Sequence, residues 1–126
     1  MNFMINQILR KFPDENENLL LVASEMSGVI LGTVCLRIKV SKSGINAAVF
    51  SSLFVAEEAR RQKVGFLLLR ECEAQAHKAG CQLITAYVKP SNTGAMAFYY
   101  KCGYQVGYLF DDGDLGICKQ LSPVSA

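Results

Sequence analysis

The chain has 126 residues, a hydrophobic fraction of 51%, a charged fraction of 19% and a formal net charge of +2. This length fits a single domain, which we expect to span residues 1–126, and this composition excludes a disordered chain. So small a net charge excludes the strongly basic surface that bulk nucleic-acid binding requires. No apolar run approaches the ~20 residues of a membrane span, and the N-terminus lacks the apolar core of a signal peptide. We therefore expect a cytoplasmic protein that has neither nucleic acid nor a membrane as a partner.

The cysteines do not form the pattern of a metal site. Five cysteines are dispersed singly along the chain, and His77 is its single histidine. Because no C-x-x-C pair is present, the clustered ligands of a structural zinc site are missing, and we predict no bound metal. An odd, dispersed set is typical of reduced thiols that pack as small apolar residues.

The first half of the chain is predicted to form one helix and three strands. Apolar residues from Phe3 to Phe12 recur at roughly helical spacing, and Pro13 stops this pattern. Runs rich in β-branched residues follow, separated by turn signals around Gly28 and Gly44. The strands are expected over Leu19–Ala23, Val29–Val40 and Ala47–Val55.

The hydrophobic period then changes from that of a strand to that of a helix. Apolar and polar residues separate onto two faces from Val64 onward, and Gly80 is a natural end for this helix. The remaining predicted elements are a strand over Leu83–Val88, a helix capped by Ser91 or Asn92 and ended by Gly103, and strands over Tyr104–Phe110 and Leu115–Leu121. This order indicates an α/β fold with a mixed, largely antiparallel six-stranded sheet and helices on both of its faces.

A basic loop joins the third predicted strand to the long helix. The first turn of a helix leaves backbone N–H groups unpaired and carries the positive end of the helix dipole, which together suit a phosphate. Arg60, Arg61 and Lys63 add positive charge beside Gly65. The chain has no G-x-x-x-x-G-K-[ST] sequence, so it does not match a P-loop NTPase. The residues alone leave two readings open, a phosphate site and a solvated basic turn.

Two motifs in order resemble those of the GNAT acetyltransferase superfamily. Arg60-Arg61-Gln62-Lys63-Val64-Gly65 resembles the family's acetyl-CoA motif, [QR]-x-x-G-x-[GA], which lies between a strand and a helix as it does here. The segment from Asn92 to Tyr104 resembles the family's N-x-x-A-x-x-[LF]-Y-x-K-x-G-[FY] helix. The resemblance covers about Leu19 to Leu121 and implies a GNAT-like fold.

The resemblance also implies an activity and a site. The implied reaction is transfer of an acetyl group from acetyl-CoA to a primary amine of a small molecule or protein, by direct attack on the thioester. The implied catalytic groups are the backbone N–H of Val55, as donor to the developing oxyanion, and Tyr99, as general acid for the departing thiolate. From the residues alone, Tyr99 also fits core packing, and Asn92 also fits a plain helix N-cap. The implied acetyl-CoA-binding residues are Phe54, Val55, Arg60, Arg61, Gln62, Lys63, Val64, Gly65, Phe66, Asn92 and Tyr99.

The chain departs from the family pattern in three respects. Lys63 stands at the motif's first glycine, and a Cβ at a position of positive φ costs about 1 kcal/mol. The family's first strand and first helix are expected to be missing, and a homodimer is the simplest cover for the sheet they would leave exposed. Ser51 and Ser52 stand where many members carry a carboxylate base, and Glu57 and Glu58 are expected to face solvent. These departures keep open an alternative, a non-catalytic GNAT-like module that binds CoA or a protein partner.

Overall fold

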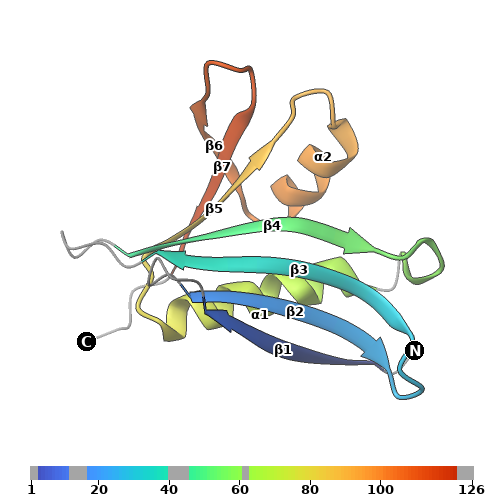
Figure 1. Cartoon of the computed structure of the whole chain (residues 1–126). Helices are drawn as coiled ribbons and strands as arrows, with labels where there is room; N and C mark the ends of the chain where they lie inside the picture. The colour runs from blue at the N-terminus through green and yellow to red at the C-terminus, as the bar shows by residue number, and fades with distance from the viewer. Residues whose placement is uncertain (1–2, 12–16, 40–45, 61–62, 122–126) are drawn as a thin grey trace.

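A computed structural model of the chain describes residues 3–11, 17–39, 46–60 and 63–121, which form one mixed sheet with two α-helices (Figure 1). The strands are β1 (Phe3–Lys11), β2 (Glu17–Glu25), β3 (Ile30–Lys39), β4 (Ala47–Val55), β5 (Leu83–Val88), β6 (Gln105–Leu109) and β7 (Leu115–Gln120). The helices are a short 3₁₀ helix η1 (Glu57–Ala59), α1 (Val64–Lys78) and α2 (Thr93–Lys101). The strand order is β1-β2-β3-β4-β5-β7-β6, and only β4 and β5 run parallel. The predicted fold class is confirmed, with seven strands in place of six.

The N-terminal segment is a strand, so the prediction of a helix over 3–12 was wrong. β1 pairs antiparallel with β2 along its whole length, from Phe3 opposite Glu25 to Lys11 opposite Glu17. Half-buried Phe3 and Ile5 alternate with exposed side chains, which is the period of a strand on a half-covered sheet. The expected absence of a first strand is corrected as well, because β1 forms an edge of the sheet. Residues 12–16, which join β1 to β2, lie outside the described residues, and so does any helix predicted before β2.

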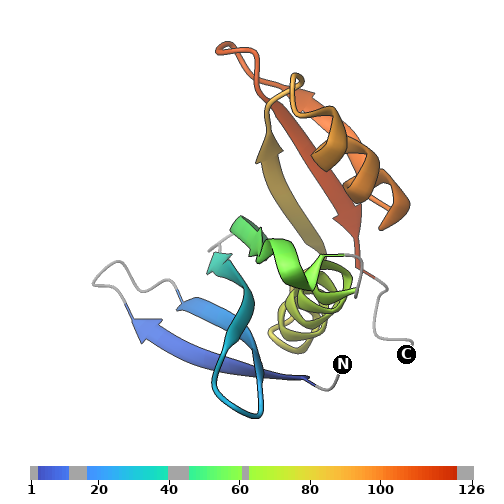
Figure 2. The ribbon, with the colours of Figure 1, turned by 90° about the vertical axis from the view of Figure 1, so that its right-hand side faces the viewer.

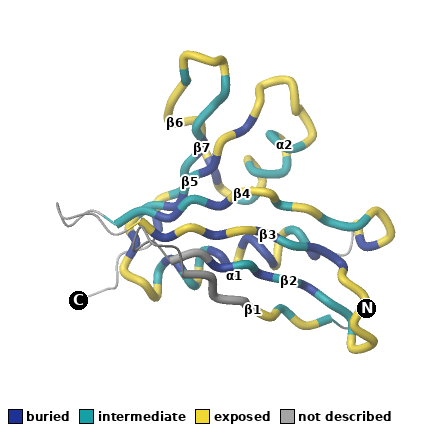
Figure 3. Tube along the Cα trace, in the orientation of Figure 1, coloured by how far each residue is buried: buried dark blue, intermediate teal, exposed yellow. Residues whose placement is uncertain are grey.

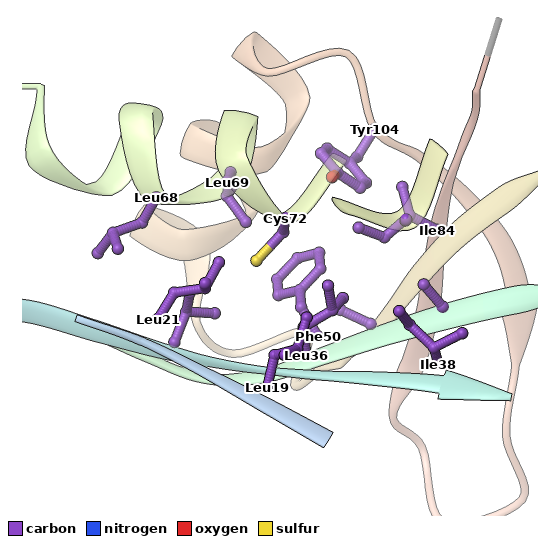
Figure 4. Close-up of a cluster of buried hydrophobic side chains, with 14 of the residues drawn as sticks. Leu19, Leu21, Leu36, Ile38, Phe50, Leu68, Leu69, Cys72, Ile84 and Tyr104 are labelled. Carbon is purple, nitrogen blue, oxygen red and sulfur yellow. The ribbon is translucent and has the colours of Figure 1, made fainter. Parts of the chain in front are cut away.

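Both α-helices lie on one face of the sheet (Figure 2). A parallel pair needs a crossover connection, and α1 supplies it between β4 and β5. Buried Phe50 of β4 points to the face that α1 covers (Figure 4). Its ring centre lies 5.5 Å from that of Tyr99 of α2, so α2 lies on the same face. On the opposite face Cys35 and Ser51 are exposed, and no helix of the described residues covers them. The expectation of helices on both faces was therefore wrong for this part of the chain.

Strand alternation builds the core between the sheet and α1. In β3, buried Val34, Leu36 and Ile38 alternate with exposed residues, as predicted for a half-buried strand. These side chains meet the buried side of α1, where Leu68 and Cys72 lie fully inside (Figures 3 and 4). Burying each large aliphatic side chain contributes roughly 1.5–3 kcal/mol, so this layer fixes α1 against β3 and β4.

A small polar network ties α2 to α1 and β7. Tyr104 is buried, and its hydroxyl donates to Oε2 of Glu73 over 2.9 Å. Lys119 Nζ donates to Oε1 of Glu73 (3.0 Å) and to the carbonyl of Cys102 (2.9 Å). Burial, followed by the negative charge of Glu73, raises the pKa of Tyr104 and keeps its hydroxyl a donor. The network satisfies the polar atoms beneath α2, as buried groups require, and fixes the end of this helix.

Three observations bear on the sequence predictions about thiols, metals and membranes. All five cysteines are free thiols, and burial raises the pKa of Cys72, which makes it an unreactive core residue. In the described part of the chain, no group of three His, Cys, Asp or Glu side chains is placed to hold a metal ion. Neither α1 nor α2, the α-helices of that part, is long and apolar enough to cross a membrane.

Candidate active site

The sheet opens between its two parallel strands. β4 and β5 pair over three positions, from Ala47 opposite Leu83 to Val49 opposite Thr85. Beyond this point β4 continues with β3 as far as Val55, while β5 continues with β7 as far as Val88. The strands diverge in Figure 1, where β5 and β7 rise away from β4. The opening exposes the far half of β4 along one side.

The backbone N–H of Val55 points into this opening. The hydrogen bond from the Ala56 N–H to the Leu31 carbonyl (2.8 Å) flanks the pair of Gly32 and Val55. That pattern identifies a non-hydrogen-bonded pair of an antiparallel ladder, in which both N–H groups point away from the partner strand. Since no strand of the described residues pairs with β4 on its other side here, this N–H is available to a ligand.

A β-bulge in β4 precedes Val55 and sets the direction of its N–H. The register shifts between Thr33 and Cys35, and Ser52 takes a φ of 55°. A bulge adds one residue to one strand, so the groups after it point differently than in a regular ladder. Positive φ at a non-glycine residue also stores strain, and such strain concentrates at functional sites.

The N-terminus of α1 lies directly beyond the end of β4 and has no side-chain cap. Lys63 is the N-cap residue, and its ammonium cannot accept a hydrogen bond from the helix N–H groups. No acidic residue occupies the first turn, so the positive end of the helix dipole is not neutralised there. Lys63 has φ 65° and ψ 15°, which confirms the left-handed geometry anticipated at this position. An anion could accept hydrogen bonds from the backbone N–H groups of Val64, Gly65 and Phe66 in this first turn, which has no preceding turn of helix to pair with.

Gly65 brings this helix end against both other parts of the site. A Cβ placed on it would lie 3.3 Å from Cγ2 of Val55 and 3.4 Å from Cζ of Phe98. Its lack of a side chain therefore lets the first turn of α1 lie close to β4 and α2 at once. Arg60 adds a cation to this loop, with its Nε 3.4 Å from the Val55 carbonyl oxygen. Arg61 and Gln62, also predicted for the loop, lie outside the described residues.

Tyr99 lies half-buried on α2 beside Phe98. Its ring centre is 5.5 Å from that of Phe98, 5.5 Å from that of Phe50 and 6.2 Å from that of Tyr104. Burial raises the pKa of the Tyr99 hydroxyl, and Cys102 adds to the shift. The phenol therefore keeps its proton at neutral pH and can donate it.

The other predicted site residues divide between structural and exposed positions. Asn92 Oδ1 accepts a hydrogen bond from the Ala95 N–H (3.1 Å), so its reading as the N-cap of α2 is confirmed. The side chain of Val64 is buried, which leaves its backbone to face a ligand, whereas Phe54 is exposed. Phe66 is partly exposed and carries the Arg70 guanidinium 5.7 Å from its ring centre.

The carboxylates near the site do not form an evident general base. Ser51 and Ser52 are exposed on β4, and Glu57 and Glu58 are exposed on η1, as the sequence predicted. Glu73 is partly buried, but both of its oxygens already bond to Tyr104 and Lys119.

Gly32 belongs to the site's framework and was missed from the sequence. A Cβ on it would lie 2.8 Å from the Phe54 carbonyl oxygen and 3.1 Å from side-chain atoms of Leu68 and Val64. Its absence of a side chain lets α1 cross β3 beside Val55. A glycine inside a β-branched run is the signal that indicates such a close approach.

Comparison with known proteins identifies the family. The sequence profile of the Acetyltransferase (GNAT) family matches residues 4–104. A search of curated proteins finds no match. A putative acyl-CoA N-acyltransferase of Klebsiella pneumoniae has a similar structure, with 20% identity, a TM-score of 0.77, and coverage of 95% of this chain and 98% of that one.

Two further structures are similar at somewhat higher identity. The PaiA N-acetyltransferase of Thermoplasma acidophilum in complex with coenzyme A is 27% identical, with a TM-score of 0.68, over 82% of this chain and 60% of that one. Naa20 of Chaetomium thermophilum in complex with a bisubstrate analogue is 25% identical, with a TM-score of 0.74, over 81% of this chain and 65% of that one. The fold and the family profile together define an acyltransferase. The chain belongs to the acetyltransferase (GNAT) family.

Proposed function

We propose that the chain transfers an acetyl group from acetyl-CoA to a primary amine by direct attack of the amine on the thioester. The observation that carries this proposal is the opening between β4 and β5, where the Val55 N–H faces outward between the uncapped start of α1 and the helix of Tyr99. An anion site, an oxyanion donor and a protonated phenol are the three groups that acyl transfer from a thioester needs. The similarity to a structure that contains coenzyme A supports the same assignment.

Each group has a separate task in this reaction. The N–H groups at the start of α1, with Arg60, Arg61, Gln62 and Lys63, bind the pyrophosphate of acetyl-CoA. The Val55 N–H donates a hydrogen bond to the thioester oxygen as that oxygen gains negative charge. The pairing of β5 with β4 ends before Val55, so β5 does not compete for this N–H. Tyr99 gives its proton to the sulfur of the departing CoA, and the attacking amine loses its proton to water.

The whole proposal is tested by a thiol-release assay with acetyl-CoA over a panel of amines. Calorimetry first establishes that the purified protein binds acetyl-CoA. Release of free CoA that depends on an amine, with one acetylated amine per thiol, is the expected result. The rival function is a non-catalytic module that binds CoA or a protein partner, and Lys63 in a left-handed conformation at a family glycine favours it. Binding of acetyl-CoA without release for any amine would establish the rival.

Removing the positive charge of the loop should weaken acetyl-CoA binding selectively. Arg60→Ala combined with Arg61→Ala deletes two donors whose charge-assisted hydrogen bonds are worth roughly 1.5–3 kcal/mol each when well formed. The dissociation constant for acetyl-CoA, measured by calorimetry, should rise by about tenfold or more. Acetyl-pantetheine has no pyrophosphate and should be affected less. An equal loss for both ligands would contradict a pyrophosphate site at this loop.

We also propose that the chain forms a homodimer through β1. This strand is an edge of the sheet, and an unpaired edge readily adds a strand from another chain. A symmetric antiparallel pair of β1 strands would close both edges at once. Sedimentation equilibrium should give a dimer at micromolar concentration, and Met4→Lys should weaken it because Met4 lies exposed on β1. Met26→Lys, at an exposed turn, is the matched control, and a monomeric wild type would rule this dimer out.

A further inference from the structure

An apolar pocket lies beside the opening, on the side of the sheet away from the helices. This open pocket has a volume of about 250 Å³ and is lined by β5, β6, β7 and the residue that follows β6. Its lining residues are Leu83, Thr85, Ala86, Tyr87, Gly107, Tyr108, Phe110, Gly116, Ile117 and Cys118. None of these ten residues carries a charge, so the pocket suits an apolar group.

The aromatic rings of Tyr87, Tyr108 and Phe110 line the pocket. Phe110 stands between the other two, with its ring centre 4.9 Å from that of Tyr87 and 4.6 Å from that of Tyr108. Tyr87 is 59% exposed and Tyr108 is 61% exposed, so each presents a large part of its surface to a ligand. Exposed aromatic side chains gathered at one place are typical of a binding site.

Glycines hold the aromatic rings close to the sheet. A Cβ on Gly116 would lie 3.1 Å from Cε2 of Phe110 and 3.3 Å from Cβ of Tyr108. Gly107 sits at a register shift of β6, and a Cβ on it would lie 2.9 Å from the Cys118 sulfur. A larger residue at Gly116 would displace the rings, and one at Gly107 would press on the Cys118 side chain of the pocket lining.

The position of the pocket relates it to the proposed reaction. Thr85 marks the last pairing of β5 with β4, and Tyr87, two residues further along β5, lies on the same face. The face of Thr85 and Tyr87 is opposite to that of the core residues Ile84 and Ala86, which point to the helices. In the proposed function acetyl-CoA is bound at the start of α1, on the helix side. The opening therefore gives an attacking amine access to the thioester from the pocket side.

We infer that this pocket binds the acceptor, and that the acceptor is a small amine carrying one aromatic ring, such as 2-phenylethylamine. The inference rests on the proposed function and adds a substrate class to it. A volume of about 250 Å³ lies below the range of roughly 300–1,000 Å³ typical of drug-sized ligands, so it fits one ring with a short chain. A polyamine would leave a second ammonium among apolar side chains without a counter-charge, which is unfavourable.

The test compares three acceptors with wild-type protein under saturating acetyl-CoA. The expected kcat/KM for 2-phenylethylamine exceeds that for spermidine by at least about tenfold, since even one methylene group in an apolar pocket discriminates 10–200-fold. A short peptide with an N-terminal glycine is the third acceptor. Preference for spermidine or for the peptide would overturn the inference while leaving acetyl transfer itself intact.

Variants locate the effect in the pocket. Tyr87→Ala combined with Tyr108→Ala should lower kcat/KM for 2-phenylethylamine by about tenfold or more and leave the acetyl-CoA dissociation constant unchanged. Tyr100→Ala is the matched control, because Tyr100 is 76% exposed on α2, away from the pocket. Circular dichroism checks folding, and Tyr87→Leu with Tyr108→Leu replaces the double alanine variant if that variant is unfolded. An unchanged preference in the folded variant would overturn the inference.

A binding measurement separates this inference from the proposed function. Saturation-transfer NMR on the CoA-loaded protein should show 2-phenylethylamine bound to wild type, and the signal should be lost in the double variant. If the protein binds CoA but acetylates no amine, a positive signal still supports the pocket as the ligand site. Absence of a signal from wild type overturns the inference. Failure to bind acetyl-CoA by calorimetry overturns the proposed function.

Discussion

Replacing Tyr99 by phenylalanine should lower kcat by about 10²–10⁴-fold, the usual contribution of general acid catalysis. The change keeps the ring that packs against Phe50, Phe98 and Tyr104 and deletes only the hydroxyl. Stability and acetyl-CoA affinity should therefore stay close to those of wild type. The rate is measured by thiol release with an acceptor that wild type acetylates, under conditions where chemistry limits turnover.

Tyr100→Phe provides the matched control, since its hydroxyl belongs to a largely exposed side chain on the same helix. This variant should retain the wild-type kcat. A Tyr99→Phe enzyme within a few-fold of wild type would show that Tyr99 is a packing residue alone.

The raised pKa of Tyr99 also predicts the direction of its pH dependence. A general acid works in its protonated form, and burial moves the loss of that proton above the ordinary value of 10.0. Deprotonation of Tyr99 should therefore not lower kcat as the pH rises through 9. A decline at lower pH that disappears in Tyr99→Phe would contradict the raised pKa.

Gly32→Ala should be a strongly damaging change, although it adds only one methyl group. The new Cβ would lie 2.8 Å from the Phe54 carbonyl oxygen, a backbone atom that cannot move without shifting β4. It would also press on Leu68 and Val64 of α1. Overpacking of this kind costs about 1–3 kcal/mol, which urea denaturation monitored by circular dichroism measures. Acetyl-CoA affinity should fall as well, because β4 and α1, the two elements that a Cβ on Gly32 would press against, both carry parts of the proposed site.

Gly94→Ala is the opposite case and serves as the control for Gly32→Ala. A Cβ on Gly94 meets no heavy atom within 4 Å, and the residue lies in the first turn of α2. Alanine there should raise the free energy of unfolding by up to about 0.5–1 kcal/mol. Equal destabilisation by both substitutions would mean that close packing at Gly32 does not limit stability.

The sequence predicted most elements because their signals are local. Gly80 ends α1 with a φ of +85°, and Asn92 caps α2 through its side chain, as the residue types indicated. The segment of β1 was mistaken for a helix because its apolar residues fit a helical spacing as well as a strand. Pairing with β2 makes this segment a strand and not a helix. No local sequence pattern specifies that β1 and β2 pair with each other. Tertiary packing likewise decides that no helix of the described residues covers the second face of the sheet.

The candidate site was predictable only in part for the same reason. Positive φ at Lys63 followed from its place in a glycine motif, and Val55 and Tyr99 were found through resemblance. The direction of the Val55 N–H depends on a bulge at Ser52 and on where β5 leaves β4, which strand propensity does not encode. The aromatic pocket joins Tyr87 to Tyr108 across β7, so its rings meet only once the sheet has formed.

The short parallel contact between β4 and β5 has a consequence for assembly of the chain. On one side of it, β1 to β4 pair in sequence order, so each contact closes a short loop. On the other side, β5 to β7 form a second unit, and the contact between the units joins segments separated by all of α1. Contacts of greater sequence separation form more slowly, so this joint should close late in folding. A ligand bound across the joint binds only the folded chain. By mass action, each tenfold increase of the free ligand concentration above its dissociation constant adds about 1.4 kcal/mol to the free energy of unfolding.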